Sequence, residues 1–369
     1  MGILSTPVTI RGMTVENRIM RSATMEYMAD LDGHVTDDLL RLYYDLARGG
    51  AGLIVTGCSA VQENGKAWAH QLGIWDDTCI TGFAKLARVI RRHGPGCRSA
   101  VQISHQGTAG YGYSYGALDK GYSLENVSGS DIRGTIEAFR DAAGRVKDAG
   151  FDAVAVHGAH GYLLSEFLSP ATNNRTDEWG GSLENRLRLS LEVCHAIRER
   201  VGEEFPILWK LNTSDYVPGG ANVEEYAEAA SQLVQNGVDL IELSGGIKDQ
   251  MKLRAKLRQE AGSKEAYFRE AIPRFRTAIK HAPLAITGGI RSMEVMEALL
   301  EQGVDLIGMC RPLISEPDLP KRLLHGPDKR PARCTSCSKC LRRIARQAVK
   351  ALERRNSGLG SDSSRQDLH

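Results

Sequence analysis

The sequence has no stretch that approaches twenty consecutive apolar residues, about the length that a helix needs to cross a membrane. We therefore expect no membrane span. The first residues, MGILSTPVTIRGM, lack the basic and apolar pattern of an export signal. The eight cysteines are scattered along 369 residues and do not suggest a disulfide framework. Together these absences predict a protein of a reducing compartment, which we take to be the cytoplasm.

The net charge of the whole chain is small, but positive charge is concentrated near the C-terminus. The formal net charge is only +2, yet residues 321–355 contain twelve Lys and Arg against two acids, so this segment carries +10 and the remainder −8. Such a basic run could contact a partner or a nucleic acid, but it is more often a solvated helix face. We favour the solvated face and expect no nucleic-acid partner.

Short apolar runs alternate with helical patterns along most of the chain. Several runs follow a glycine that ends a helix, as in AGFDAVAV, NGVDLIEL and QGVDLIGM. Strands separated by helices predict a parallel sheet, and eight such units predict a closed (β/α)₈ barrel. The expected strands are 18–22, 52–56, 100–103, 153–156, 207–211, 240–243, 284–287 and 306–309.

The remainder of the chain departs from a minimal barrel. Long excursions are expected over 106–134 and 245–270, and LRRIARQAVKALERR after residue 340 predicts an amphipathic helix. We therefore divide the chain into a barrel over 1–325, a basic, cysteine-containing helical extension over 326–355 and a disordered tail over 356–369. The apolar stripe of the extension would need a cover, which suggests a homo-oligomer.

In a barrel of this kind, functional residues gather where the strands end. His157, His160 and Tyr162 follow one predicted strand, and such donors could hold a polarised carbonyl oxygen. A zinc site is disfavoured because no third ligand of suitable spacing lies near the two histidines. At the last two strands, Gly288 and Gly289 would let the backbone approach a phosphate, and Arg311 could chelate its oxygens.

These motifs resemble the Old Yellow Enzyme family of FMN-dependent ene-reductases, and the resemblance covers about residues 3–325. It rests on ENRIMRSAT, DGHVTDDLLRLYYDLARGGAGLIVTG, VQISHQG, ITGGI and RPLI, and above all on HGAHGYLLSEFLSPATNNRTDEWGGSLENR at 157–186. The chain departs from the family pattern at Lys210, Cys310 and Thr108, which stand where relatives have arginine, glycine and arginine.

The resemblance implies how FMN would be held. Gln102 would face the pyrimidine edge of the flavin, and Lys210 would place a cation beside it. Tyr27 would lie over the flavin or serve only as a loop aromatic. The other implied cofactor contacts are Ala23, Thr24, Met25, Cys58, Gly288, Gly289, Cys310 and Arg311.

The resemblance also implies a reaction. NADH or NADPH would reduce the flavin, and an enone or enal would then take its place, its oxygen held by His157 and His160. The flavin N5 would deliver a hydride to Cβ while Tyr162 protonates Cα.

Cys334, Cys337 and Cys340 form a CxxCxxC segment, which resembles the iron–sulfur segment of 2,4-dienoyl-CoA reductase-like members. A four-iron cluster normally takes four thiolates, and no cysteine follows residue 340. Zinc with an outside ligand is an alternative. We favour a third interpretation, a vestigial segment that binds neither a cluster nor a metal.

Two other functions stay open at this point. In the first, a flavoenzyme exchanges electrons with another redox protein through such a cluster, so iron and sulfide content would distinguish it. In the second, a non-catalytic barrel binds a partner or nucleic acid through its basic tail, and it would show no flavin and a salt-sensitive association.

Overall fold

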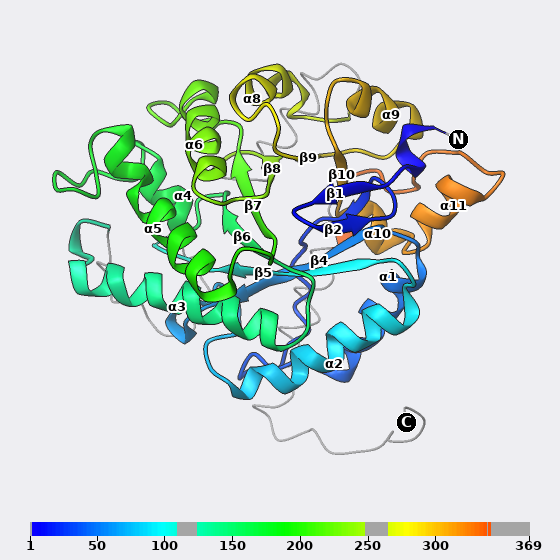
Figure 1. The fold of residues 1–369 in the computed structure, drawn as a ribbon, viewed down its shortest axis with the longest axis horizontal. Helices are drawn as coiled ribbons and strands as arrows, with labels where there is room; N and C mark the ends of the chain where they lie inside the picture. The colour runs from blue at the N-terminus through cyan, green and yellow to red at the C-terminus, as the bar shows by residue number, and fades with distance from the viewer. Residues whose placement is uncertain (1, 109–123, 248–264, 338, 341–369) are drawn as a thin grey trace.

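A closed barrel of eight parallel strands forms the centre of the computed structural model, which describes residues 2–108, 124–247, 265–337 and 339–340. Helices surround these strands (Figure 1). The strands follow one another around the barrel in chain order, and the last pairs with the first. They are β3 (Ile19–Arg21), β4 (Leu53–Ala60), β5 (Arg98–Ser104), β6 (Ala153–Gly158), β7 (Ile207–Asn212), β8 (Leu240–Ser244), β9 (Leu284–Thr287) and β10 (Leu306–Met309).

The helices begin and end at residues whose chemistry suits those positions. Ser182 caps its helix by accepting a hydrogen bond from Asn185 N, and Asn222 and Ser128 each form a capping box. The helices are α1 (Asp37–Arg48), α2 (Thr78–His93), α3 (Gly129–Asp148), α4 (Leu163–Leu168), α5 (Leu183–Val201), α6 (Val223–Gln235), α8 (Ile272–Ala278), α9 (Met293–Glu301), α10 (Arg311–Ser315) and α11 (Leu319–His325), with short 3₁₀ turns at Ile3–Ser5, Glu63–Gly65, Leu124–Asn126 and Arg269–Ala271.

Each strand turns alternate side chains to the inside of the barrel and to the helices. On β7, for example, Trp209 and Leu211 belong to the large apolar cluster between strands and helices, whereas Leu208 belongs to the cluster inside the barrel. Inside, the lower part is apolar, with small residues such as Ala100, Ala153 and Ala285 among the larger ones. This packing fixes the height and direction of every side chain at the strand ends.

A short hairpin closes the N-terminal end of the barrel. β1 (Val8–Ile10) pairs antiparallel with β2 (Met13–Val15), and Ile10, Met13 and Val15 join the cluster inside the barrel. The sequence analysis did not predict this hairpin, because its two strands are only three residues long. Its tight turn has positive φ at Arg11 and Gly12.

All eight predicted strands and the (β/α)₈ barrel are confirmed. The glycines of the three GxD repeats, Gly150, Gly237 and Gly303, have positive φ directly after a helix cap residue, as expected. The predicted C-terminal helix and tail, residues 341–369, lie outside the described residues, as do parts of both long excursions. Among the described helices, none is long and apolar enough to cross a membrane.

The hairpin should contribute to the stability of the barrel through its buried face. Ile10 is fully buried, so Ile10→Ala should lower the free energy of unfolding by about 2–5 kcal/mol through lost burial and a cavity. Thr9→Ala is the matched control because Thr9 is exposed on the same strand, and it should change the stability by less than about 0.5 kcal/mol. Urea unfolding followed by circular dichroism measures both. Equal effects of the two substitutions would contradict this role for the hairpin.

Candidate active site

A layer of polar side chains lies inside the barrel above its apolar part. The inward positions that are apolar lower on the strands continue upward as polar residues, for example from Leu208 to Lys210 and from Leu240 to Glu242. These polar side chains are all buried, and their strands place them around one end of the barrel axis. They are Ser22, Gln102, His157, Lys210, Glu242, Ser244 and Thr287.

Lys210 and Glu242 form an ion pair within this layer. They are register partners on β7 and β8, with 3.2 Å between Lys210 Nζ and Glu242 Oε1. Lys210 Nζ also donates to Ser22 Oγ at 3.0 Å, and Ser22 Oγ donates to Glu242 Oε1 at 2.5 Å. Ser22 follows β3, which lies on the opposite side of the barrel from β7. The ammonium group is thus held near the axis by contacts from two directions.

Gln102 and Cys58 stand side by side on β5 and β4, where they are register partners above a bulge in β4. The side-chain amide nitrogen of Gln102 is buried and has no hydrogen-bond partner among the described residues. Cys58 accepts a weak hydrogen bond from Gln71, and burial raises the pKa of its thiol to about 12. A buried amide without a partner is costly, so Gln102 is suited to a ligand with a polar edge.

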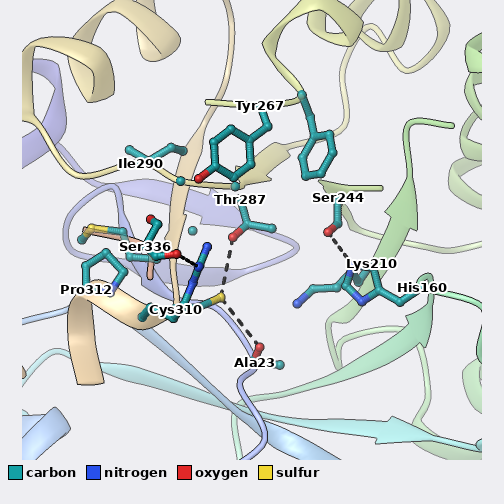
Figure 2. Close-up of a pocket in the computed structure, with 16 residues that line it drawn as sticks. Ala23, His160, Lys210, Ser244, Tyr267, Thr287, Ile290, Cys310, Pro312 and Ser336 are labelled. Carbon is teal, nitrogen blue, oxygen red and sulfur yellow. Dashed lines mark hydrogen bonds between the residues drawn. The ribbon is translucent and has the colours of Figure 1, made fainter. Parts of the chain in front are cut away.

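The two histidines and the tyrosine of the long motif meet at the end of β6. The ring centroid of His157 lies 5.1 Å from that of His160 and 4.8 Å from that of Tyr162. His160 Nε2 contacts Ser244 Oγ at 2.6 Å, and its backbone N–H donates to Asn212 at 3.2 Å. Figure 2 shows His160 beside Ser244 and Lys210.

The turn that joins these residues is strained. His160 and Gly161 both have positive φ, 68° and 78°, and a Cβ on Gly161 would lie 2.6 Å from the Ile247 carbonyl oxygen. A non-glycine residue in this region is uncommon, and it persists where the surroundings hold it. Here the contacts of His160 with Asn212 and Ser244 hold it. The turn brings Tyr162 back beside the ring of His157.

Burial keeps His157 neutral. It lowers the pKa of His157 to about 3, with a further contribution from the nearby charge of Lys210. Its Nδ1 has no partner among the described residues. A neutral imidazole carries one N–H donor, so His157 can donate to a carbonyl oxygen without itself being charged.

The other end of the pocket is built from β9, β10 and the start of α10 (Figure 2). Gly288 and Gly289 have positive φ and no room for a side chain, because a Cβ on Gly289 would lie 2.3 Å from the ring of Tyr267. Arg311 is buried, lines the same pocket and donates to the Ser336 carbonyl at 2.8 Å. Two successive glycines beside a guanidinium are an arrangement that suits a phosphate.

Cys310 lies in this pocket, with Thr287 Oγ1 at 3.7 Å and the Ala23 carbonyl at 3.9 Å from its sulfur. Burial acts to raise the pKa of its thiol, but the positive charges of Lys210 and Arg21 outweigh burial and leave the pKa below its usual value. The side chain that stands where relatives have glycine thus lies between Thr287 and the Ala23 carbonyl.

Hydrogen bonds hold the segment after β3 in place. Glu26 accepts a hydrogen bond from Gly57 N at 2.7 Å and one from the Tyr43 hydroxyl. Thr24 accepts from Arg21 at 2.8 Å, and Met25 follows it, half-buried. Tyr27 packs edge-on against Trp68 with 5.4 Å between ring centroids, and burial raises its pKa to about 12.

The cysteines of the C-terminal segment are all free thiols. Only one trio of described His, Cys, Asp and Glu side chains has its ligand atoms within 4.8 Å of one another, and it comprises Asp30, Asp32 and His34. Cys334, Cys337 and Cys340 form no such group. Metal binding by these cysteines stays a prediction.

The structure brings many of the predicted site residues to one pocket and separates others. Gln102, His157 and Cys58 belong to the barrel interior nearby, whereas Met25 and Tyr27 lie in the segment after β3. Thr108, which departs from the family pattern, binds the carboxylate of Glu166. The predicted residues that line the pocket are Ala23, His160, Lys210, Gly288, Gly289, Cys310 and Arg311.

Several residues of the site were missed by the sequence analysis. Glu242 was taken as part of an apolar strand, although a carboxylate in LIELS was a visible signal. Tyr267 and Phe268 also line the pocket. They are the only two aromatic residues in the sequence of the second long excursion, 245–270. Ser336 reaches the pocket from the cysteine-containing segment, and nothing in the sequence connects it to Arg311.

The residues present fit FMN. The unpaired amide of Gln102 and the cation of Lys210 suit the pyrimidine edge of a flavin, while Gly288, Gly289 and Arg311 suit a phosphate. The fold and this site define a (β/α)₈-barrel flavoprotein.

The comparisons with known proteins identify the family. A model of the NADH:flavin oxidoreductase / NADH oxidase family matches residues 4–330. The chain belongs to this family, and it is an oxidoreductase that uses FMN and a reduced nicotinamide. It is 35% identical over 326 residues to an NADPH dehydrogenase of Geobacillus sp. (strain WCH70), a match that covers 86% of this chain and 92% of that protein.

Solved structures agree with this assignment. A complex of 2-naphthoyl-CoA reductase with 2-naphthoyl-CoA has a TM-score of 0.81 at 28% identity, covering 91% of this chain and 54% of the other. An old yellow enzyme homologue from Zymomonas mobilis has a TM-score of 0.73 at 24% identity, covering 89% and 94% of the two chains, and shows the shared fold. The chain thus spans about half of the first of these proteins and most of the second.

The buried His157 should make stability depend on pH. Its pKa is about 3 in the folded protein and about 6.5 in an unfolded chain, so the unfolded state binds more protons below pH 6.5. Stability should therefore fall as the pH is lowered from 7 toward 3. His157→Gln should reduce the loss between pH 7 and pH 5 by about 2 kcal/mol.

Urea unfolding of the apoprotein at pH 7, 6 and 5 measures this difference. His195→Gln is the matched control, because His195 lies on the outer helix α5 and is exposed to solvent. A wild-type pH dependence that persists unchanged in His157→Gln would contradict a neutral, buried His157.

Proposed function

We propose that this protein reduces the activated C=C bond of α,β-unsaturated carbonyl compounds, enones or enals, with NADH or NADPH as the reductant. The observation that carries the proposal is the group at the end of β6, where the ring centroid of His157 lies 5.1 Å from that of His160 and 4.8 Å from that of Tyr162. Two imidazole donors beside one phenol suit a substrate whose oxygen gains negative charge while its carbon gains a proton.

The two histidines would hold the carbonyl oxygen of the substrate. Because the pKa of His157 is about 3, it donates as a neutral imidazole over the working pH range. The contact of His160 Nε2 with Ser244 Oγ fixes the direction of that ring. An oxyanion donor of this kind contributes about 2.7–4 kcal/mol to the transition state.

Tyr162 would supply the proton to Cα. It stands at the N-cap position of α4, and its ring centroid lies 4.8 Å from that of His157, so the phenol ring is kept beside the carbonyl-binding group. When bound, FMN would take a hydride from the nicotinamide and deliver it to Cβ of the substrate.

The remaining predicted residues would hold the cofactor. We assign Gln102 and Lys210 to the pyrimidine edge, and Gly288, Gly289 and Arg311 with the Cys310 backbone to the phosphate. Ala23, Thr24 and Met25 would pass under the ring, with Cys58 beside it, and Tyr27 would border the substrate pocket. Burial of the Gln102 amide without a protein partner supports this assignment.

The absorption spectrum of the anaerobic holoenzyme tests the proposal. Flavin bands should bleach on addition of NADH or NADPH and return on addition of cyclohexenone. Bands that bleach but return only with oxygen would indicate an oxidase, or a dehydrogenase that uses an electron acceptor other than an enone. A protein that binds no FMN even when it is supplied would contradict the whole assignment.

Tyr162→Phe separates the two half-reactions. Loss of the proton donor should slow reoxidation by cyclohexenone by roughly 10²–10⁴-fold, while reduction by the nicotinamide changes little. Stopped-flow absorbance measures each half-reaction by itself. Tyr216→Phe is the control, since Tyr216 is an exposed tyrosine on another loop. An equal loss in both half-reactions would point to a structural role for Tyr162.

A further inference from the structure

We propose that Glu242 is a positioning residue that aims Lys210 at the flavin and offsets its charge, and so sets the reduction potential of the bound FMN. This inference rests on the place that the proposed function gives to Lys210. Neither the family motifs nor the sequence analysis assigns a role to Glu242.

The geometry of the three buried side chains carries the first step. Glu242 Oε1 lies 3.2 Å from Lys210 Nζ, and Ser22 accepts from the ammonium at 3.0 Å while donating to the same carboxylate oxygen at 2.5 Å. An ammonium has three N–H donors, and two of them point to these partners. The Lys210 side chain also lines the pocket, so the third donor is available to a ligand there.

Burial explains why a partner is present. The side chains of Lys210 and Glu242 are only 4% and 6% exposed. A buried charge is strongly unfavourable unless it is paired and hydrogen-bonded. Glu242 therefore stabilises the charged lysine inside the barrel, and Ser22 holds the head group of the pair in one orientation.

The second step concerns charge. Reduced flavin carries negative charge at its pyrimidine edge, and a nearby cation stabilises it. The pair of Lys210 and Glu242 has no net charge, so the carboxylate opposes much of that stabilisation. The other groups that face Lys210 are His157, which is neutral, the thiols of Cys58 and Cys310, and the more distant Arg21.

We therefore expect the reduction potential of the bound FMN to be lower than it would be beside a cation that has no neighbouring carboxylate. A lower potential makes the reduced cofactor a stronger hydride donor toward the substrate. Removal of the Glu242 charge with the fold kept should move the potential to more positive values.

The experiment compares the FMN-loaded wild type with Glu242→Gln at pH 6. The readouts are the equilibrium reduction potential and the Kd for sulfite, which adds to oxidised flavin and leaves it negatively charged. Glu242→Gln should bind sulfite about tenfold more tightly, a change that corresponds to about 30 mV for a two-electron couple. Glu242→Asp keeps the charge and should stay close to the wild type.

Two further variants keep the test decisive. Glu225→Gln breaks an ion pair with Arg186 on the outside of the barrel and should leave both readouts unchanged. The double variant Lys210→Met and Glu242→Met replaces the buried pair by apolar groups, which proteins often tolerate. Because the double variant lacks the cation as well, it should bind sulfite more weakly than Glu242→Gln.

The outcomes are distinct. A potential that does not move in Glu242→Gln, or that becomes more negative, overturns the inference. So does a double variant that binds sulfite as tightly as Glu242→Gln, since the effect of Glu242 would then not act through the lysine. A wild-type protein that binds no FMN would instead overturn the proposed function, before the role of Glu242 is reached.

Discussion

A lysine ammonium buried inside a barrel is the constraint on which the upper part of this structure depends. Lys210 is buried, and its charge is tolerated because Glu242 on β8 and Ser22, which follows β3, both bind it. Those contacts fix the register of polar residues around the barrel axis. His157 is the register partner of Lys210, and Gln102 is buried inside the same barrel, so the group that would hold a flavin and the group that would hold a carbonyl share one polar layer.

The fold was predictable because its signals are local and repeated. Each strand is a short apolar run, and glycine with positive φ marks the end of the preceding helix at Gly150, Gly237 and Gly303. The strand ends could also be located, which is why His157, His160, Lys210 and Arg311 were found from their positions. The hairpin at the other end was not found, because its three-residue strands show too little alternation.

The parts of the site that escaped prediction depend on contacts between distant segments. In the sequence, Glu242 is a single polar residue in an apolar strand. Only the strand register shows that it lies beside Lys210. The sequence likewise does not show that Tyr267 lies against Gly289 and leaves no room there for a side chain. Spacing along a chain carries no information about such pairs, since each is fixed by the closure of the barrel.

One arginine connects the cofactor end of the pocket to the C-terminal segment. Arg311 donates to the carbonyl of Ser336, between Cys334 and Cys337, and it also lines the proposed phosphate site. A guanidinium has five N–H donors in a fixed plane, so the contact with Ser336 orients the whole group. A phosphate in the proposed site would therefore contact an arginine that also binds the C-terminal segment. By reciprocity, a cofactor that gains affinity when the segment is docked must hold that segment in place by the same free energy.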